Sequence, residues 1–395
     1  MAWNTCWPEA MAAIHLPRTI RIGGGVLNEL PEVLSASGLS RPLIVTDAWI
    51  AGSDILQRVE ELLAKAGIAV RTFTGVVPDP TVASTEAGCT FLAAGDHDCV
   101  IGLGGGSPID SAKMIAVKRD RQIEVRDLKA PHQEDAPGLP IIAIPTTAGT
   151  GSEATRFTII TDAETDEKML CAGLAYLPQI AIVDYELTLT KPARLTADTG
   201  IDSLVHAVEA YVSKRANPFS DSMALSAMRL IWANLPIACA DPGNRTAREA
   251  LMLGALQGGI AFSNSSVALV HGMSRPIGAH FHVAHGLSNA MLMPLVTAWS
   301  APAALPRYAD CARAMGLADS SVSDQGAVGR LVEALERINA DLGVPTPADY
   351  GISRERWDEL VPLMAQQALA SGSPANNPRV PVADEIEALY RQAYA

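Results

Sequence analysis

The sequence predicts two parts: an N-terminal α/β domain built on a parallel, Rossmann-like sheet, then an all-helical domain. Two observations predict this fold class. Strand-like apolar runs alternate with helix-like segments through the first half, a pattern typical of parallel sheets covered by helices. After about Thr188 the strand-like runs disappear and apolar residues recur at helical spacing. Because Lys191-Pro192 interrupts the pattern, we expect domains at 1–190 and 191–395.

The elements of the first domain follow in order from these periodicities. Short apolar runs predict strands at 19–22, 42–47, 69–73, 99–103, 140–145, 158–160 and 179–183. Helical spacing predicts helices at 27–35, 55–66, 81–94 and 107–117. The runs Cys99–Leu103 and Pro140–Pro145 are nearly all apolar, so we expect both strands to be buried.

The second domain is predicted to hold helices only. Their expected ranges are 201–212, 220–235, 246–261, 288–299, 302–315, 327–342, 355–370 and 383–394.

Composition argues against several classes of function and location. The net charge of −13 argues against nucleic acid or an anionic membrane as a partner. No run of about 18 apolar residues is present, so we expect no membrane span, and Met1–Ala13 lacks the pattern of a signal peptide. The six cysteines are scattered, which predicts free thiols and a cytoplasmic protein.

A glycine-rich turn predicts a phosphate-binding site. Gly104, Gly105 and Gly106 follow an apolar run and precede a helix, so phosphate oxygens could approach the backbone at a helix N-terminus. Ser107 fits the N-cap, Pro108 the first helical position, and Asp110 a capping box. The alternative is that the glycines only make a tight turn.

A second loop with small and hydroxyl residues follows the run Pro140–Pro145. Its side chains and glycines could line a dinucleotide groove, although an ordinary polar loop is the alternative; the candidates are Thr146, Thr147, Thr150 and Ser152.

A cluster of imidazoles and one carboxylate predicts a metal site. Asp202 and His206 are four residues apart, which on a helix places both side chains on one face. His271 and His285 could complete a set of four ligands with positions left for water or substrate. The alternative for the Asp202–His206 pair is a surface pair or helix cap.

Together these motifs resemble the iron-containing (group III) alcohol dehydrogenases over nearly the whole chain. The matching segments are Gly104–Asp110, Pro145–Glu153, Gly200–Asp202 with His206, His271–Met273 and His285-Gly286. The resemblance implies an α/β nucleotide domain, a helical metal domain with a cleft between them, and metal ligands at Asp202, His206, His271 and His285.

The resemblance also implies further contacts with the cofactor. Asp47 stands at a strand end ahead of the glycine turn, where it would bind the adenosine ribose and select NAD over NADP; a strand-end cap is the alternative. Asp79 occupies a position where relatives usually carry Asn. Lys168 and Leu195 match positions in the cofactor groove, and the alternative for Lys168 is a solvated lysine.

The predicted activity is hydride transfer between NAD(H) and a small primary alcohol or aldehyde at a metal, with a homodimer as the expected assembly. Iron is the metal of the family, and zinc, manganese or cobalt would suit the same ligands. The alternatives are a lyase similar to dehydroquinate synthase, a polyol oxidoreductase similar to glycerol dehydrogenase, and a non-catalytic metal or nucleotide binder.

One departure from the family predicts the substrate class. Relatives typically read His-Gly-Met-x-His, whereas this chain has Arg275 at the last position. Arginine cannot relay a proton but can hold a carboxylate, so we expect a hydroxy acid similar to 4-hydroxybutyrate, with Arg156 as a second candidate. The proton would leave through water or His282, and family pocket positions fall at Phe157, Phe262 and Val267. Pairing of Arg275 with a nearby carboxylate or with cofactor phosphates is the alternative.

Overall fold

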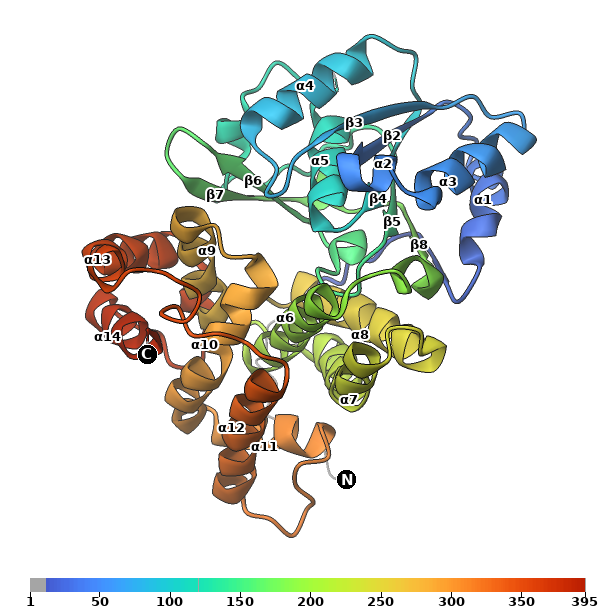
Figure 1. Ribbon diagram of the computed structural model, residues 1–395. Helices are drawn as coiled ribbons and strands as arrows, with labels where there is room; N and C mark the ends of the chain where they lie inside the picture. Colours follow the sequence, from blue (N-terminus) through green and yellow to red (C-terminus); the bar gives the residue numbers. More distant parts are fainter. Residues whose placement is uncertain (1–11, 120, 395) are drawn as a thin grey trace.

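The computed structural model describes residues 12–119 and 121–394, which form an α/β part and a helical part (Figure 1). The predictions for Cys6 and for most of Met1–Ala13 fall outside these residues. The last strand of the main sheet, β8, ends at Val183, and the first long helix of the second part begins at Ala193. This order of elements confirms the predicted fold class.

Six parallel strands form the main sheet, in the order β1-β8-β5-β4-β2-β3. β4 and β5 come from the two nearly continuous apolar runs and are buried along their whole length, because helices cover both faces of the sheet. The bounds are β1 (Thr19–Ile22), β2 (Pro42–Asp47), β3 (Arg71–Val76), β4 (Cys99–Gly104), β5 (Ile141–Pro145) and β8 (Ile180–Val183).

Strand side chains alternate between two hydrophobic layers, as the two-residue period of a strand requires. Ile44 and Ile101 belong to the layer under α1 and α3, whereas Leu43 and Val100 belong to the opposite layer under α4 and α5. The helical segments here are η1 (Val26–Glu29), α1 (Leu30–Ala36), α2 (Ala48–Ala51), α3 (Asp54–Lys65), α4 (Val82–Ala93), α5 (Gly106–Lys118) and η2 (Val125–Leu128).

An antiparallel hairpin of β6 (Phe157–Asp162) and β7 (Glu167–Ala172) stands apart from the main sheet. Only its first strand is predicted from the sequence, because β7 begins with two charged residues. Ile160 and Met169 bury one side of the hairpin in a cluster beside α5. β7 also contacts α9 of the helical part (Figure 1), so the hairpin touches both parts of the molecule.

The helical part packs around one large core. α6, α7 and α8 lie directly below the sheet in Figure 1, and the later helices extend away from it. The helices are α6 (Ala193–Val212), α7 (Pro218–Ala240), α8 (Arg245–Ser263), α9 (Leu269–Phe281), α10 (His285–Ser300), α11 (Leu305–Ala314), α12 (Asp324–Asp341), α13 (Arg354–Ala370) and α14 (Ala383–Ala393), with short turns η3 (Ser152–Ala154), η4 (Leu174–Tyr176), η5 (Tyr185–Thr188), η6 (Ala301–Ala303) and η7 (Ser373–Asn376).

One helix of the described chain, α7, is long and apolar enough to cross a membrane by length and composition alone. Core helices meet the same criterion, and α7 packs against α6 and α8 through buried residues such as Met228 and Ile231. The thiols within the described residues are all free, as predicted: Cys89, Cys99, Cys171, Cys239 and Cys311.

Candidate metal and dinucleotide site

The structure brings the four predicted metal ligands together. Asp202 Oδ1 lies 3.9 Å from Nε2 of His206, 3.6 Å from Nε2 of His271 and 3.7 Å from Nε2 of His285. Asp202, His206 and His271 are buried, while His285 is partly exposed. The closest group is Asp202, His271 and His285, whose ligand atoms all lie within 4.8 Å of one another.

Helix packing explains this convergence. Asp202 and His206 lie one turn apart in the middle of α6, and His271 lies in the first turn of α9. Gly286 lets the first turn of α10 rest on the backbone of α6, because a Cβ there would lie 2.2 Å from the carbonyl oxygen of Asp198. This close approach carries His285 to the side of Asp202.

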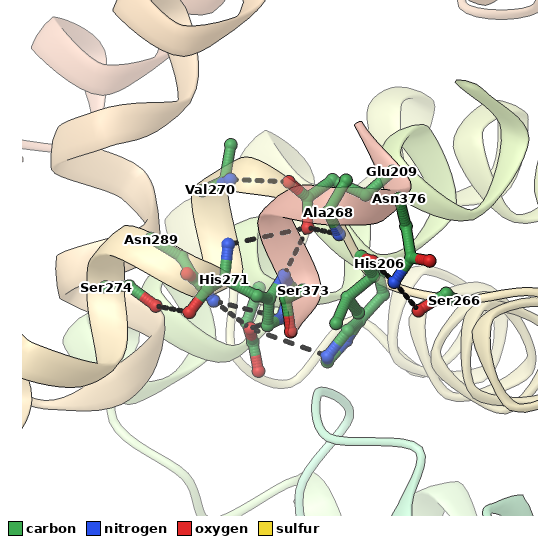
Figure 2. Close-up of polar contacts among 12 residues, drawn as sticks. His206, Glu209, Ser266, Ala268, Val270, His271, Ser274, Asn289, Ser373 and Asn376 are labelled. Carbon is green, nitrogen blue, oxygen red and sulfur yellow. Dashed lines mark hydrogen bonds and ion pairs between the residues drawn. The ribbon is translucent and has the colours of Figure 1, made fainter. Parts of the chain in front are cut away.

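A buried carboxylate that the sequence prediction missed orients His271. Glu209 Oε2 lies 2.7 Å from Nδ1 of His271, and the Glu209 carboxylate also accepts from the backbone N–H groups of Ala268 and Val270 (Figure 2). Since a carboxylate only accepts, Nδ1 carries a proton, and in the neutral imidazole Nε2 therefore presents its lone pair toward Asp202. Glu209 follows Asp202 and His206 at positions i+7 and i+3 of α6, and this spacing is the signal that could have found it.

Asn289 is the second residue that the prediction missed. It is fully buried, its Nδ2 donates to Asp202 Oδ1 at 2.6 Å, and the same nitrogen lies 3.3 Å from Nε2 of both His271 and His285. It stands one helical turn after His285 on α10, a spacing that could have indicated its place.

The protonation of the cluster suits a cation. Burial lowers the pKa of His206 to about 4 and that of His285 to about 3, so both imidazoles are neutral. Burial opposes protonation of His271 as well, yet Asp202 and Glu209 raise its pKa above the ordinary value. The lone pairs of the two neutral imidazoles, His206 and His285, therefore face the Asp202 carboxylate, an arrangement that fits a divalent metal with nitrogen and oxygen ligands.

An aromatic stack borders this cluster. Phe157 stacks on Phe262 with ring centroids 6.2 Å apart, Phe262 stacks on the imidazole of His206 at 4.3 Å, and His206 lies 4.5 Å from His271. Val267 is buried just before α9. Phe157 and Phe262, two of the predicted pocket residues, thus form an apolar wall that continues into the ligand set.

The glycine turn lies at the carboxyl end of β4. Gly104 has a φ of 148° and leaves room for the ring of Pro108, which would lie 2.5 Å from a Cβ at this position. The predicted cap is wrong: Gly105 is the N-cap of α5, and no side chain caps it. The chain turns earlier at Gly104, and Asp110 instead accepts hydrogen bonds from Ser152 Oγ at 2.6 Å and from the backbone N–H of Ile159 at 2.9 Å.

The second predicted loop packs against the glycine turn. The backbone N–H of Thr146 donates to the carbonyl of Gly104 at 2.8 Å, and Thr147 and Thr150 lie beside Gly105 and Gly106. Together the two loops form one surface where β4 and β5 end, the edge at which parallel sheets bind nucleotides.

The same loop is held against the helical part by two glycines. The carbonyl of Gly149 accepts from Ser203 Oγ of α6 at 2.8 Å. Gly151 has a φ of 62°, and a Cβ added to Gly259 of α8 would lie 2.7 Å from its Cα. The loop therefore contacts α6 and α8, which lie beside the four predicted metal ligands.

Four other predicted cofactor residues lie outside these two loops. Asp47 caps α2, with Oδ1 accepting from the backbone N–H of Ile50 at 2.8 Å, and Leu195 is exposed on α6. Asp79 has a φ of 49° and accepts from Lys168 Nζ at 2.8 Å. The Lys168 side chain is only 5% exposed, so the alternative of a solvated lysine is wrong.

Arg275 and His282 occupy different environments on α9. Arg275 is partly buried one turn after His271, and its Nη1 donates to Ser373 Oγ at 3.0 Å. His282 is exposed and adopts a left-handed conformation at the C-terminal end of the helix.

Comparisons with known proteins agree with this geometry. Residues 17–185 match the iron-containing alcohol dehydrogenases, and residues 196–394 match the C-terminal domain of the Fe-containing alcohol dehydrogenase family. The chain is 37% identical to long-chain-alcohol dehydrogenase 1 of Geobacillus thermodenitrificans, covering 98% of each chain. It is 35% identical to the NAD-dependent methanol dehydrogenase of Bacillus methanolicus, covering 97% of this chain and all of that one.

A solved structure of 1,3-propanediol oxidoreductase superimposes with a TM-score of 0.93 at 34% identity, covering 98% of this chain and all of the other. These relatives are oxidoreductases of alcohols, in agreement with the dehydrogenase prediction rather than the lyase alternative. The chain belongs to the iron-containing alcohol dehydrogenase family.

Proposed function

We propose that this NAD-dependent dehydrogenase interconverts small primary alcohols and aldehydes at one divalent metal held by Asp202, His206, His271 and His285. The observation that carries the proposal is the convergence of three imidazole nitrogens on Asp202 Oδ1, beside a dinucleotide-type loop. When bound, the metal, iron in this family, supplies a Lewis acid for the substrate oxygen while NAD accepts the hydride.

The surrounding side chains act by positioning. Glu209 fixes the tautomer of His271, and Asn289 holds Asp202 by its amide. Phe262 stacks on His206, Phe157 stacks on Phe262, and Val267 is buried; their apolar side chains would keep water away from the reacting carbon.

The dinucleotide is proposed to lie across the two loops. Gly104, Gly105 and Gly106 let its phosphates approach the N-terminus of α5, and the side chains at the rim are Ser107, Asp110, Thr146, Thr147, Thr150 and Ser152. Asp47 accepts from the adenosine ribose and repels a 2′-phosphate. Lys168, Asp79 and Leu195 complete the groove.

The alcohol proton needs an acceptor other than Arg275, which does not titrate usefully. His282 is exposed at the end of α9 and can exchange protons with solvent. We assign the proton to His282 or to water.

The assembly and compartment are proposed as a cytoplasmic homodimer. The free thiols of the described chain support the compartment, and light scattering would test the dimer.

The test of the proposed function is a substrate screen with defined metal content. Metal-free protein is reloaded with Fe²⁺ or Zn²⁺ and assayed for NADH formation with primary alcohols, 1,2-diols, glycerol and hydroxy acids, and for aldehyde reduction. Fully loaded protein that oxidises no alcohol and reduces no aldehyde would contradict the proposal.

A further inference from the structure

Arg275 is a cation without a matching anion. Its guanidinium donates to Ser373 Oγ, and no carboxylate of the described residues lies within ion-pair distance of it. Burial lowers its pKa to about 10, so the guanidinium remains charged at neutral pH. A partly buried charge of this kind is costly unless a partner of opposite charge is supplied.

The nearest buried carboxylate cannot be that partner. Glu209 influences Arg275 only at longer range, and its oxygens are already engaged. Oε2 accepts from His271 and Ala268, and Oε1 accepts from Val270. The alternative that Arg275 pairs with a neighbouring carboxylate is therefore wrong for the residues that the structure describes.

Arg275 lies near the place where the reacting end of the substrate would bind. It follows the proposed ligand His271 by one turn of α9, and its partner Ser373 is buried at the start of η7. η7 packs on α9 beside His271, because Pro374 Cγ would lie 2.7 Å from a Cβ at Gly272. Of the five N–H donors of a guanidinium, one is used by Ser373, and a carboxylate can take two of the others in parallel.

We propose that Arg275 and Ser373 form a subsite for an anionic group on the substrate, so the preferred substrates are short ω-hydroxy acids and the matching semialdehydes. This inference rests on the proposed alcohol dehydrogenase activity and names its substrate class. The carbinol end lies at the proposed metal ligands, and the carboxylate is held at Arg275, one turn of α9 after His271.

Arg156 is the other candidate for the anion and lies farther from the ligands. Its guanidinium is 5.6 Å from the ring centroid of Phe157, which is the outer ring of the stack that reaches His206 through Phe262. Burial and the neighbouring Arg215 lower the pKa of Arg156. Arg156 therefore provides a matched control on the other side of the apolar wall.

The test compares kcat/KM for 4-hydroxybutyrate and 1-butanol in the metal-loaded native enzyme, in Arg275→Gln and in Arg156→Gln. We expect the native enzyme to favour the hydroxy acid by roughly 10- to 150-fold (about 1.5–3 kcal/mol). Arg275→Gln should remove most of this ratio, Arg275→Lys should restore part of it, and Arg156→Gln should leave it unchanged. Calorimetry should show butyrate binding to the NAD-loaded native enzyme and not to Arg275→Gln.

Three outcomes would overturn the subsite. They are a native preference for 1-butanol, a ratio that Arg275→Gln leaves unchanged, and an increase in the KM for NAD that is equal with both substrates, which would assign Arg275 to the cofactor. Turnover of neither substrate by loaded enzyme would instead contradict the proposed function, so the two failures are distinguishable.

Discussion

Glu209 and His271 form a buried carboxylate–imidazole pair, with Oε2 and Nδ1 2.7 Å apart. The pair determines which imidazole nitrogen faces Asp202, because the carboxylate can only accept a hydrogen bond, and it accepts this one from Nδ1–H. Glu209→Gln keeps the shape and removes the charge, and its amide can point the wrong group toward Nδ1. We expect the affinity for metal to fall by roughly 10- to 100-fold, measured by competition with a chromogenic chelator. The exposed Glu336→Gln is the control, and equal affinities in both variants would contradict the role of Glu209.

The four-ligand set is tested by removing imidazoles one at a time. His271→Ala and His206→Ala should each lose most of the bound metal and nearly all activity, because a missing ligand leaves the remaining ones without a complete site. Metal is measured by elemental analysis and activity by NADH formation. An active, metal-free His271→Ala enzyme would refute the assignment.

We expect cofactor choice to depend on the charge of Asp47. Asp47→Asn keeps a side chain able to cap α2 and removes the charge, whereas Asp47→Gly costs only a few tenths of a kcal/mol as a cap. Both variants should raise kcat/KM for NADP relative to NAD, because repulsion of the 2′-phosphate is removed. Asp54→Asn at the exposed start of α3 is the control. Equal use of both cofactors by the native enzyme would count against this role.

Glu153 should contribute stability that declines between mildly acidic and neutral pH. Burial raises the pKa of this carboxyl from 4.5 to about 7. Between these values the folded state keeps a proton that the unfolded state has lost, so the contribution of Glu153 is fully present below pH 4.5 and is lost as the pH rises toward 7. This contribution changes by about 1.4 kcal/mol per pH unit. The slopes of stability against pH in urea unfolding should therefore differ between the native protein and Glu153→Gln by about this amount, and exposed Glu333→Gln should keep the native slope; equal slopes in the native protein and Glu153→Gln would refute the assignment.

The contact between Gly151 and Gly259 should tolerate no side chain. A Cβ on Gly259 would lie 2.7 Å from Gly151 Cα, so Gly259→Ala should destabilise the protein by about 1–3 kcal/mol through overpacking. Gly329 of α12 has no neighbour within 4 Å of such a Cβ, and Gly329→Ala should stabilise by roughly 0.5–1 kcal/mol. Unfolding midpoints in urea decide whether the two substitutions differ in sign.

Much of the fold is readable from local patterns, because the parallel strands and long helices carry periodic apolar residues. The set of proposed metal ligands can be predicted in part, since Asp202 and His206 share a helical face. β7 is not predicted from the sequence because it begins with two charged residues. The cap at Ser107 fails because Asp110 has partners from distant segments, Ser152 of η3 and Ile159 of β6.

The site residues that the sequence prediction missed are recognisable only from their contacts in the folded chain. Ser373 is 98 residues from Arg275 in the sequence, and no local spacing connects them. Glu209 and Asn289 do lie at helical spacing from the predicted ligands, but a carboxylate and an amide at such positions are common on ordinary helices. Only the packing of α6, α9 and α10 distinguishes them.

The aromatic stack gives unequal freedom to redesign the substrate pocket. Phe262 stacks on the proposed ligand His206, so a variant selected there for bulkier alcohols should also shift this imidazole and lower the affinity for metal. Phe157 lies one ring farther out and stacks on Phe262 rather than on a histidine. Enzyme engineers who want to change chain-length preference should therefore diversify the outer ring and leave the inner one fixed.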